Sequence, residues 1–240
     1  MEEITAKFAT AFRSKRLIYR AVDNSEADRE LLACTLYDPV SQGLSDPTLF
    51  RPMGESAGKK AIEQIIDQAL LAVVICLPAA DDVADDTGGG AADQTQDQQQ
   101  QPPRLPLPGT ALKQAQARAT PIGSLFLSRQ RQATTAHWRW TRLAVALAEP
   151  FQNKGYGAEA IAWALDWAFD FAGMHRVELG TASYNARALA VYDRLGFTRE
   201  GRRRESIYSN GKWHDLVEFG MLEAEWDALR GKRDADGGAP

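Results

Sequence analysis

The sequence is poor in the residues that mark several classes of protein. Among its 240 residues there are two cysteines, Cys34 and Cys76, and three histidines. Neither cysteine has a metal-ligand spacing, and both sit among apolar residues, so the sequence predicts buried free thiols rather than a disulfide framework or a zinc site. We therefore predict a reducing, cytoplasmic location and no bound metal.

Long apolar runs and a strong charge of one sign are also missing. The longest apolar stretch, ALLAVVICLP at residues 69–78, is about half the length that crosses a bilayer and is typical of a buried strand. The first residues lack the apolar core of a signal peptide. The net charge of −4 provides no general attraction to nucleic acid or membranes, so we predict neither partner.

Composition changes abruptly after Pro78. From about residue 79 to residue 119 the chain is acidic, then rich in glycine, glutamine and proline, with little to bury. This predicts a disordered insertion within one domain at residues 1–230, because long surface insertions add little loop-closure entropy. A second interpretation is a segment that recruits a partner. Residues 231–240 are predicted to form a flexible tail.

Outside that stretch, the hydrophobic pattern alternates between strand-like and helix-like segments. Helices are predicted from Ser25 and over residues 56–71, 155–172 and 185–197. Strands are predicted over residues 16–22, 69–78, 120–129, 137–149 and 175–183, followed by a hairpin turning at Asn210-Gly211. The order predicts a mixed α/β (α+β) domain. On the helix at 155–172, Glu159, Asp166 and Asp170 are predicted to mark a narrow solvent face.

The stretch FQNKGYGAEA, residues 151–160, joins a strand to a helix and carries Gly155 and Gly157. Glycines at a helix N-terminus let backbone N–H groups approach a phosphate. A P-loop requires Lys-Ser or Lys-Thr after its second glycine, and here Ala-Glu follows. The dinucleotide pattern G-x-G-x-x-A fits, but Pro150 interrupts the preceding strand and only one strand and one helix follow before the hairpin. A Rossmann-type oxidoreductase therefore stays a distant alternative.

With Gln152 included, the motif is Q-x-x-G-x-G after a strand broken by proline, and NARALAVYDRLGF follows at residues 185–197. Together these resemble the acyl-coenzyme A site of the GNAT acyltransferase family. The resemblance is to the branch of ribosomal-protein N-terminal acetyltransferases, in a fungal-type member, and covers most of the chain outside the insertion and tail. It implies a three-layer fold with a mostly antiparallel central sheet, splayed at the cofactor site, and helices on both faces.

The resemblance also implies a cosubstrate and its binding residues. Acetyl-CoA would be the acyl donor, with its pyrophosphate on the loop before the helix and its pantetheine arm paired with strand backbone as an added strand. Asn185 would contact the cofactor as well as cap its own helix. The implied cofactor-binding residues are Val145, Leu147, Gln152, Asn153, Lys154, Gly155, Tyr156, Gly157, Ala158 and Asn185.

The implied reaction is direct attack of a primary amine on the thioester in a ternary complex. Tyr192 matches the family tyrosine beside the thioester sulfur and is the predicted general acid. Relatives often carry a carboxylate where this chain has Arg142, so Glu149 is the predicted substitute base. Other substitutes are His137, His214 and Asp215.

Several alternatives stay open at this point. The acceptor is a protein N-terminus, a polyamine or another small amine, and the protein is a monomer or a homodimer. A catalytically weak acyl-CoA-binding module is the alternative function, because the usual carboxylate is missing. The basic run GRRRE at residues 201–205 is either a solvated strand end or a site for the adenosine 3′-phosphate or an acidic substrate.

Overall fold

The structure is a computed structural model of the chain. It describes residues 8, 10–23, 25–36, 40, 43–44, 55–79, 115–129 and 133–235. Most of the predicted insertion, residues 80–114, and the last part of the predicted tail, residues 236–240, lie outside the described residues.

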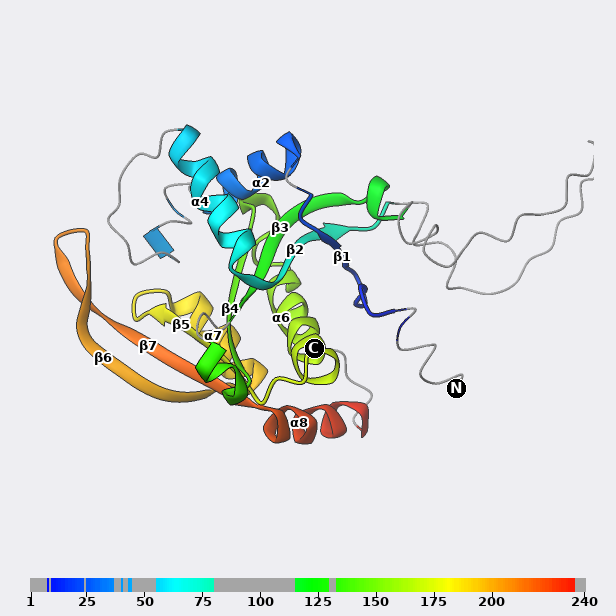
Figure 1. Ribbon diagram of the computed structural model, residues 1–240. Coiled ribbons are helices and arrows are strands. Elements are labelled where there is room, and N and C mark those ends of the chain that lie inside the picture. The colour runs from blue at the N-terminus through cyan, green and yellow to red at the C-terminus, as the bar shows by residue number, and fades with distance from the viewer. Residues whose placement is uncertain are drawn as a thin grey trace, which may run out of the picture.

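The strands form one seven-stranded sheet in the order β1-β2-β3-β4-β5-β7-β6. All neighbours are antiparallel except β4 and β5, which run parallel at the centre. The β6–β7 hairpin curves away from the rest of the sheet (Figure 1). The strands are β1 (Ile18–Ala21), β2 (Ala69–Leu77), β3 (Thr120–Ser128), β4 (Trp140–Leu147), β5 (Arg176–Ala182), β6 (Thr198–Ser209) and β7 (Lys212–Leu222).

Helices cover both faces of this sheet, as the resemblance implies. On one face, α6 packs through Ile161 and Leu165 against the main core, which includes Leu143 of β4 and Leu179 of β5. On the other face, α2 and α4 bury Leu32 and other apolar residues against β3. The helices are α2 (Glu26–Leu36), α4 (Glu55–Asp67), α6 (Tyr156–Asp166), α7 (Ala186–Leu195) and α8 (Glu223–Ala235), with a π-helical turn at Trp167–Phe171.

Local sequence signals account for several element boundaries. Ser25 Oγ accepts from the Asp28 N–H at 3.2 Å and caps α2, as predicted. The hairpin turns at Asn210-Gly211, where both residues have positive φ. Gly123 lets β3 approach β4 closely, because a Cβ there would lie 2.3 Å from the carbonyl oxygen of Ala146.

Three predictions near the chain's ends and its insertion need correction. Residues 223–235 form α8, where a hairpin end and tail were predicted, and Trp226 anchors this helix by burial and by donating to Asp166 at 2.8 Å. Residues 115–118 are helical, and Ala115 and Ala119 are buried beside Ile18, so the predicted insertion ends earlier than residue 119. Gln116 also donates to the Tyr19 carbonyl at 2.9 Å.

Other corrections concern exposure and strand boundaries. Cys76 is buried as predicted, whereas Cys34 is exposed on α2. The helix predicted at 56–71 ends at Asp67, because β2 begins at Ala69. The strand predicted at 137–149 begins at Trp140, after a 3₁₀ helix at Ala133–Trp138.

Candidate active site at the gap between β4 and β5

The parallel strands β4 and β5 separate after a short paired stretch. Their pairing covers Trp140 to Arg142 on β4 and Arg176 to Glu178 on β5, and no pairing continues beyond. A cavity of about 810 Å³ occupies the gap. Its lining includes residues 142–147 of β4, residues 180–182 of β5, the loop before α6 and one side of α7. The splayed sheet that the resemblance implies is therefore present.

The free edge of β4 directs alternate backbone groups into this gap. The Arg142 N–H donates to Ser128 Oγ at 3.0 Å, toward β3, and the Ala146 carbonyl also lies against β3. Since N–H and C=O groups of alternate residues point to the same edge, those of Leu143 and Val145 point to the gap. An amide-bearing ligand can pair with this edge as an added strand.

The loop between β4 and α6 is shaped for close approach to the helix N-terminus. Asn153 has a φ of 61° and Gly155 a φ of 83°, both in the left-handed region. Gly155 is the N-cap of α6, and no side chain caps this helix. Gly157 follows in the first turn and lines the cavity. The first-turn N–H groups of α6, together with the helix dipole, therefore form a site suited to an anion.

Gln152 has a bracing role in the structure. Its Nε2 donates to the Leu147 carbonyl at 2.8 Å, and its Oε1 accepts from Arg187 Nη1 at 2.8 Å. The side chain thus ties the end of β4 to the first turn of α7 across the wide end of the gap. The Leu147 carbonyl, predicted to be unpaired, is already occupied by this bond.

An N-terminal segment holds the same loop from outside the cavity. Arg16 Nη1 donates to the Lys154 carbonyl at 3.1 Å, and its guanidinium lies 4.7 Å from the centre of the Tyr156 ring. Glu159, only 5% exposed, accepts from Ser14 Oγ at 2.7 Å, from the Arg16 N–H at 2.6 Å and from Arg16 Nε at 2.7 Å. We call these four residues, Ser14, Arg16, Lys154 and Glu159, the loop latch.

The loop latch includes one of the residues that were predicted to face solvent on α6. Glu159 is buried against the N-terminal segment. Asp166 accepts from Trp226 and Arg230, and Asp170 pairs with Arg230 of α8. The prediction is therefore wrong for Glu159, whereas Asp170 is exposed and Asp166 is half-exposed, as a solvent face requires.

The start of α7 lies at the wall of the cavity. Asn185 Oδ1 accepts from the Ala188 N–H at 3.1 Å, which confirms the predicted N-cap. Its Nδ2 donates to the Leu44 carbonyl at 3.1 Å, and the Tyr184 hydroxyl donates to the Gly43 carbonyl. The short described stretch at 43–44 is therefore fixed to α7, and Leu44 lines the cavity.

Tyr192 lines the cavity farther along α7. At 1.5 Å per helical residue it lies about 10 Å beyond Asn185, toward the end where β4 and β5 are paired. Its ring packs edge-on against Phe219 at 5.4 Å between centroids. Burial raises the pKa of Tyr192 above its ordinary value of 10.0, so the hydroxyl holds its proton at neutral pH.

The structure brings most of the predicted site residues to one cavity. Its lining includes Tyr192 and the predicted cofactor residues Val145, Leu147, Gln152, Asn153, Gly155, Gly157, Ala158 and Asn185. Lys154 and Tyr156 belong to the same loop but do not line the cavity. Glu149 is exposed on the 3₁₀ turn at Glu149–Phe151 and is not among the lining residues, so the structure does not bring the predicted base to Tyr192.

The other base candidates also lie outside the lining. His137 is exposed, His214 packs edge-on against Tyr184, and Asp215 is engaged by Arg202. The predictions missed several lining residues from distant parts of the chain: Leu44, Thr181, Tyr184, Arg187, Arg194, Ile207 and Leu216. The local sequence pattern gave no signal for these residues, although Arg187 and Arg194, seven residues apart on α7, share one face of that helix.

Comparison with known families decides what kind of domain surrounds this cavity. The Acetyltransferase (GNAT) family matches residues 81–197, which include the free edge of β4, the glycine loop and α7. The chain contains a GNAT family domain. The glycine loop and the capped helix α7 both lie within the matched residues.

Curated relatives match the GNAT domain over part of their length. The candidate ribosomal N-acetyltransferase YdaF of Bacillus subtilis is 33% identical over 97 residues, 40% of this chain and 49% of that protein. The spermidine N(1)-acetyltransferase of Vibrio cholerae is 28% identical, over 37% of this chain and 51% of its own length. The matched segment thus spans about half of these relatives. The fungal affinity stays a prediction.

Solved structures share the GNAT fold along nearly their full length. A spermidine N-acetyltransferase from Vibrio cholerae, in complex with CoA and spermine, has a TM-score of 0.63 at 17% identity, covering 89% of this chain and 99% of that one. A GNAT acetyltransferase from Bacillus anthracis has a TM-score of 0.60 at 15% identity, with the same coverage. At these identities the likeness establishes the fold.

GNAT acetyltransferases use acetyl-CoA, and the cavity fits its parts. The gap between β4 and β5 offers strand backbone for the pantetheine amides, and the α6 N-terminus offers N–H groups for the pyrophosphate. Across the described residues, no cluster of three or more His, Cys, Asp or Glu side chains is placed to bind a metal. Within the same ranges, no helix has the length and apolarity to span a bilayer.

Proposed function

We propose that the protein transfers an acetyl group from acetyl-CoA to a primary amine in a ternary complex. The observation that carries this proposal is the cavity, because one continuous space joins the α6 N-terminus, the free edge of β4 and Tyr192. These are the three parts that such a transfer needs: a phosphate site, a pantetheine edge and a proton donor.

The chemistry that acetyl-CoA supplies is a thioester carbonyl. The amine nitrogen forms a bond to the carbonyl carbon, the carbon–sulfur bond breaks, and the amine loses a proton while the sulfur gains one. In this proposal the Val145 N–H, directed into the gap, donates to the carbonyl oxygen as negative charge develops there. Tyr192, kept protonated by burial, gives a proton to the sulfur.

A second function is favoured by one observation. No Asp, Glu or His side chain appears among the described residues that line the cavity, so no direct general base is present there. A protein that binds acyl-CoA and recruits a partner through residues 80–114 would have no need of a base. We keep the cytoplasm as the predicted location in both cases.

Two measurements separate these functions. Release of free CoA thiol is followed with acetyl-CoA and a panel of peptides, amino acids and polyamines. Transfer to at least one amine supports the acetyltransferase, whereas tight acetyl-CoA binding with no transfer to any amine supports the binding module. Calorimetry with acetyl-CoA and with NAD(H) adds a further test, because NAD(H) binding without CoA binding would exclude both.

A further inference from the structure

We propose that the acceptor end of the cavity binds an amine with a carboxylate a few bonds away, and that Arg142 holds this carboxylate. Two kinds of molecule share this chemistry: free α-amino acids, and peptide N-termini with an acidic residue among the first positions. Polyamines are poor acceptors on this proposal. The inference rests on the proposed acetyltransferase function and names its substrate class.

The charge of the cavity wall is the first argument. Its charged side chains, among the described residues, are Arg142, Arg187 and Arg194, and none is acidic. A polyamine would place several positive charges beside these guanidinium groups, and the nearby carboxylate of Glu218 is already paired with Arg203. A substrate with a carboxylate can form bidentate, charge-assisted hydrogen bonds with a guanidinium, whose planar geometry matches that of the carboxylate.

The position of Arg142 assigns it to the acceptor end. It lies on the last paired rung of β4 and β5, opposite Glu178, at the narrow end of the gap. Side chains alternate along a strand, and Leu143 packs into the core that α6 covers, so Arg142 projects from the opposite face. The guanidinium lies over Gly180, where an added Cβ would be 2.9 Å from Arg142 Nη2. Glycine at this position keeps the space for it.

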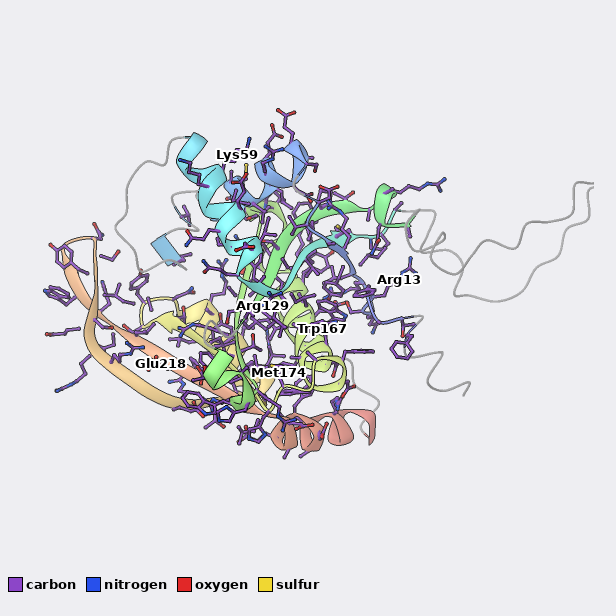
Figure 2. The ribbon with its side chains drawn as sticks, viewed as in Figure 1. Arg13, Lys59, Arg129, Trp167, Met174 and Glu218 are labelled. Atoms are coloured by element: carbon purple, nitrogen blue, oxygen red, sulfur yellow. The ribbon has the colours of Figure 1, made fainter. Side chains whose placement is uncertain are left out.

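Arg142 is also available for a ligand. It forms no ion pair with another described residue, and its side chain is exposed. The neighbouring carboxylates are engaged elsewhere: Glu218 of β7, labelled in Figure 2, accepts from Arg203, and Glu178 accepts from Arg176 at 2.7 Å. The charge of Arg142 helps to lower the pKa of Glu218, after the larger effect of Arg203, but the two make no ion pair within 4 Å. Binding an external carboxylate therefore breaks no ion pair of Arg142 with a described residue.

The other two arginines lie on α7. Arg187 is on its first turn and donates to Gln152, next to the loop that leads into α6, so it belongs to the cofactor end. Arg194 lies on the row of residues 187, 191 and 194, two residues beyond Tyr192 and therefore toward the acceptor end. Arg142 differs from both in lying on the central sheet over Gly180, and we assign the acceptor carboxylate to it.

The missing base favours α-amines for an independent reason. The α-amino group of a peptide N-terminus titrates near 8, so a substantial fraction is neutral at pH 7.5, whereas an amine that titrates near 10.4 is about 0.1% neutral. A cavity wall without a carboxylate or imidazole gives the second kind of amine no help in losing its proton. Peptide N-termini with an acidic residue nearby therefore combine the two features that this cavity selects, whereas a free amino acid offers the carboxylate alone.

The test compares matched acceptors at saturating acetyl-CoA. The acceptors are an Asp-Gly-Gly amide peptide, its Asn-Gly-Gly counterpart, free aspartate and spermidine. We expect kcat/KM for the Asp peptide to exceed that for the Asn peptide by about tenfold, the size of one charge-assisted pair, and to exceed that for spermidine by more. Free aspartate against the Asp peptide shows which source of the carboxylate is used.

Variants assign the preference to one side chain. Arg142→Met is expected to equalise the Asp and Asn peptides, Arg142→Lys to keep part of the preference, and Arg142→Glu to reverse it and improve spermidine. Arg118→Met, an exposed arginine outside the cavity lining, should keep the wild-type ratio. Unchanged acetyl-CoA affinity in calorimetry confirms that Arg142→Met is folded.

Two results would overturn the proposal while leaving the acetyltransferase function standing: a wild-type preference for spermidine or for the Asn peptide, or an Asp preference that survives in Arg142→Met. If no amine is acetylated at all, the proposed function fails instead. The subsite is then tested by calorimetric binding of the two peptides to the CoA-saturated protein. Equal affinities would contradict it, and a tighter Asp peptide that loses its advantage in Arg142→Met would support it.

Discussion

The two ends of the cavity differ in the groups that line them: one is mainly backbone and the other mainly side chains. The cofactor end consists mainly of backbone from one continuous stretch, residues 152–158, together with the edge of β4. The acceptor end gathers side chains from strands far apart in sequence, among them Arg142 of β4 and Leu216 of β7. Backbone donors serve any sequence that keeps the local conformation, whereas side chains change one at a time. We therefore expect that one fold can keep the same acyl donor, acetyl-CoA, while the acceptor amine changes.

Tyr192 lies between the two ends and gives the largest expected effect. Tyr192→Phe removes the hydroxyl but keeps the ring that packs on Phe219. We expect kcat to fall by about 10²-fold or more, as for loss of a general acid, while acetyl-CoA affinity stays the same. Steady-state kinetics and calorimetry measure the two. Unchanged turnover would show that the Tyr192 hydroxyl is not the general acid.

The pH dependence tests the same residue. Burial raises the pKa of Tyr192, so the folded protein keeps the hydroxyl protonated at a pH where a free phenol has begun to ionise. The proton donor is therefore present below pH 10 and is lost only as pH rises through the raised value. We expect no fall of kcat on the alkaline side up to about pH 10. A descending limb between pH 8 and 9 would contradict this.

Gly155→Ala tests the cofactor end, where backbone groups form most of the cavity wall. Its φ of 83° disfavours any side chain, by about 1–2 kcal/mol for the left-handed region. Its Cβ would also lie 3.2 Å from Arg16 Nη2. We expect acetyl-CoA affinity to fall about tenfold in calorimetry, since 1.4 kcal/mol corresponds to that factor.

The matched control for Gly155→Ala is Gly211→Ala. Gly211 has a similar φ of 77° but lies in the hairpin turn, outside the cavity lining, with nothing within 4 Å of an added Cβ. This variant should lose stability and keep its acetyl-CoA affinity. Equal affinities for both variants would mean that the loop before α6 does not hold the cofactor.

The loop latch predicts an intermediate effect. Arg16→Met removes the contacts to Glu159 and to the Lys154 carbonyl, and we expect the unfolding free energy to fall by about 1.5–3 kcal/mol, in the range for bonds to a charged group. The 43% exposed Arg16 side chain favours the lower value. KM for acetyl-CoA should rise several-fold with kcat unchanged, and Arg16→Lys should recover part of both. A change in kcat alone would contradict a positioning role.

Asn185 gives the smallest expected effect and separates two roles. Asn185→Ala loses the N-cap of α7, which costs about 1 kcal/mol of stability, and also the bond to the Leu44 carbonyl. Asn185→Asp keeps a capping oxygen but has no amide donor for Leu44. Thermal unfolding should therefore separate Ala from Asp, whereas KM for acetyl-CoA should rise in both. Equal stability of the two variants would contradict a stabilising role for the Asn185 N-cap.

The same division explains what the sequence could predict. The glycine loop, the Asn185 cap and the Asn210-Gly211 turn are local signals, and the structure has each where expected. Glu159 was misread as solvent-facing, because its partners Ser14 and Arg16 lie more than 140 residues away and no local pattern reports them.

Two further misses have the same physical origin. The residues of α8 are largely polar, so its buried residue Trp226 did not form part of an apolar stripe at helical spacing. Glu149 was predicted as a substitute for the carboxylate that Arg142 replaces, but it is exposed on the 3₁₀ turn at Glu149–Phe151 and does not line the cavity. Local pattern predicted what the backbone does, and failed where side chains meet across the fold.

The pairing of β2 with β3 has a consequence for how this chain tolerates new material. Leu77 pairs with Thr120, so residues 78–119 leave and re-enter the sheet at adjacent strand ends, and the register on either side is set by the strands themselves. Doubling the length of such a connection adds only about 0.6 kcal/mol of closure entropy. We therefore expect a tag or a reporter domain inserted between β2 and β3, before the buried residue Ala115, to leave the register of these two strands unchanged.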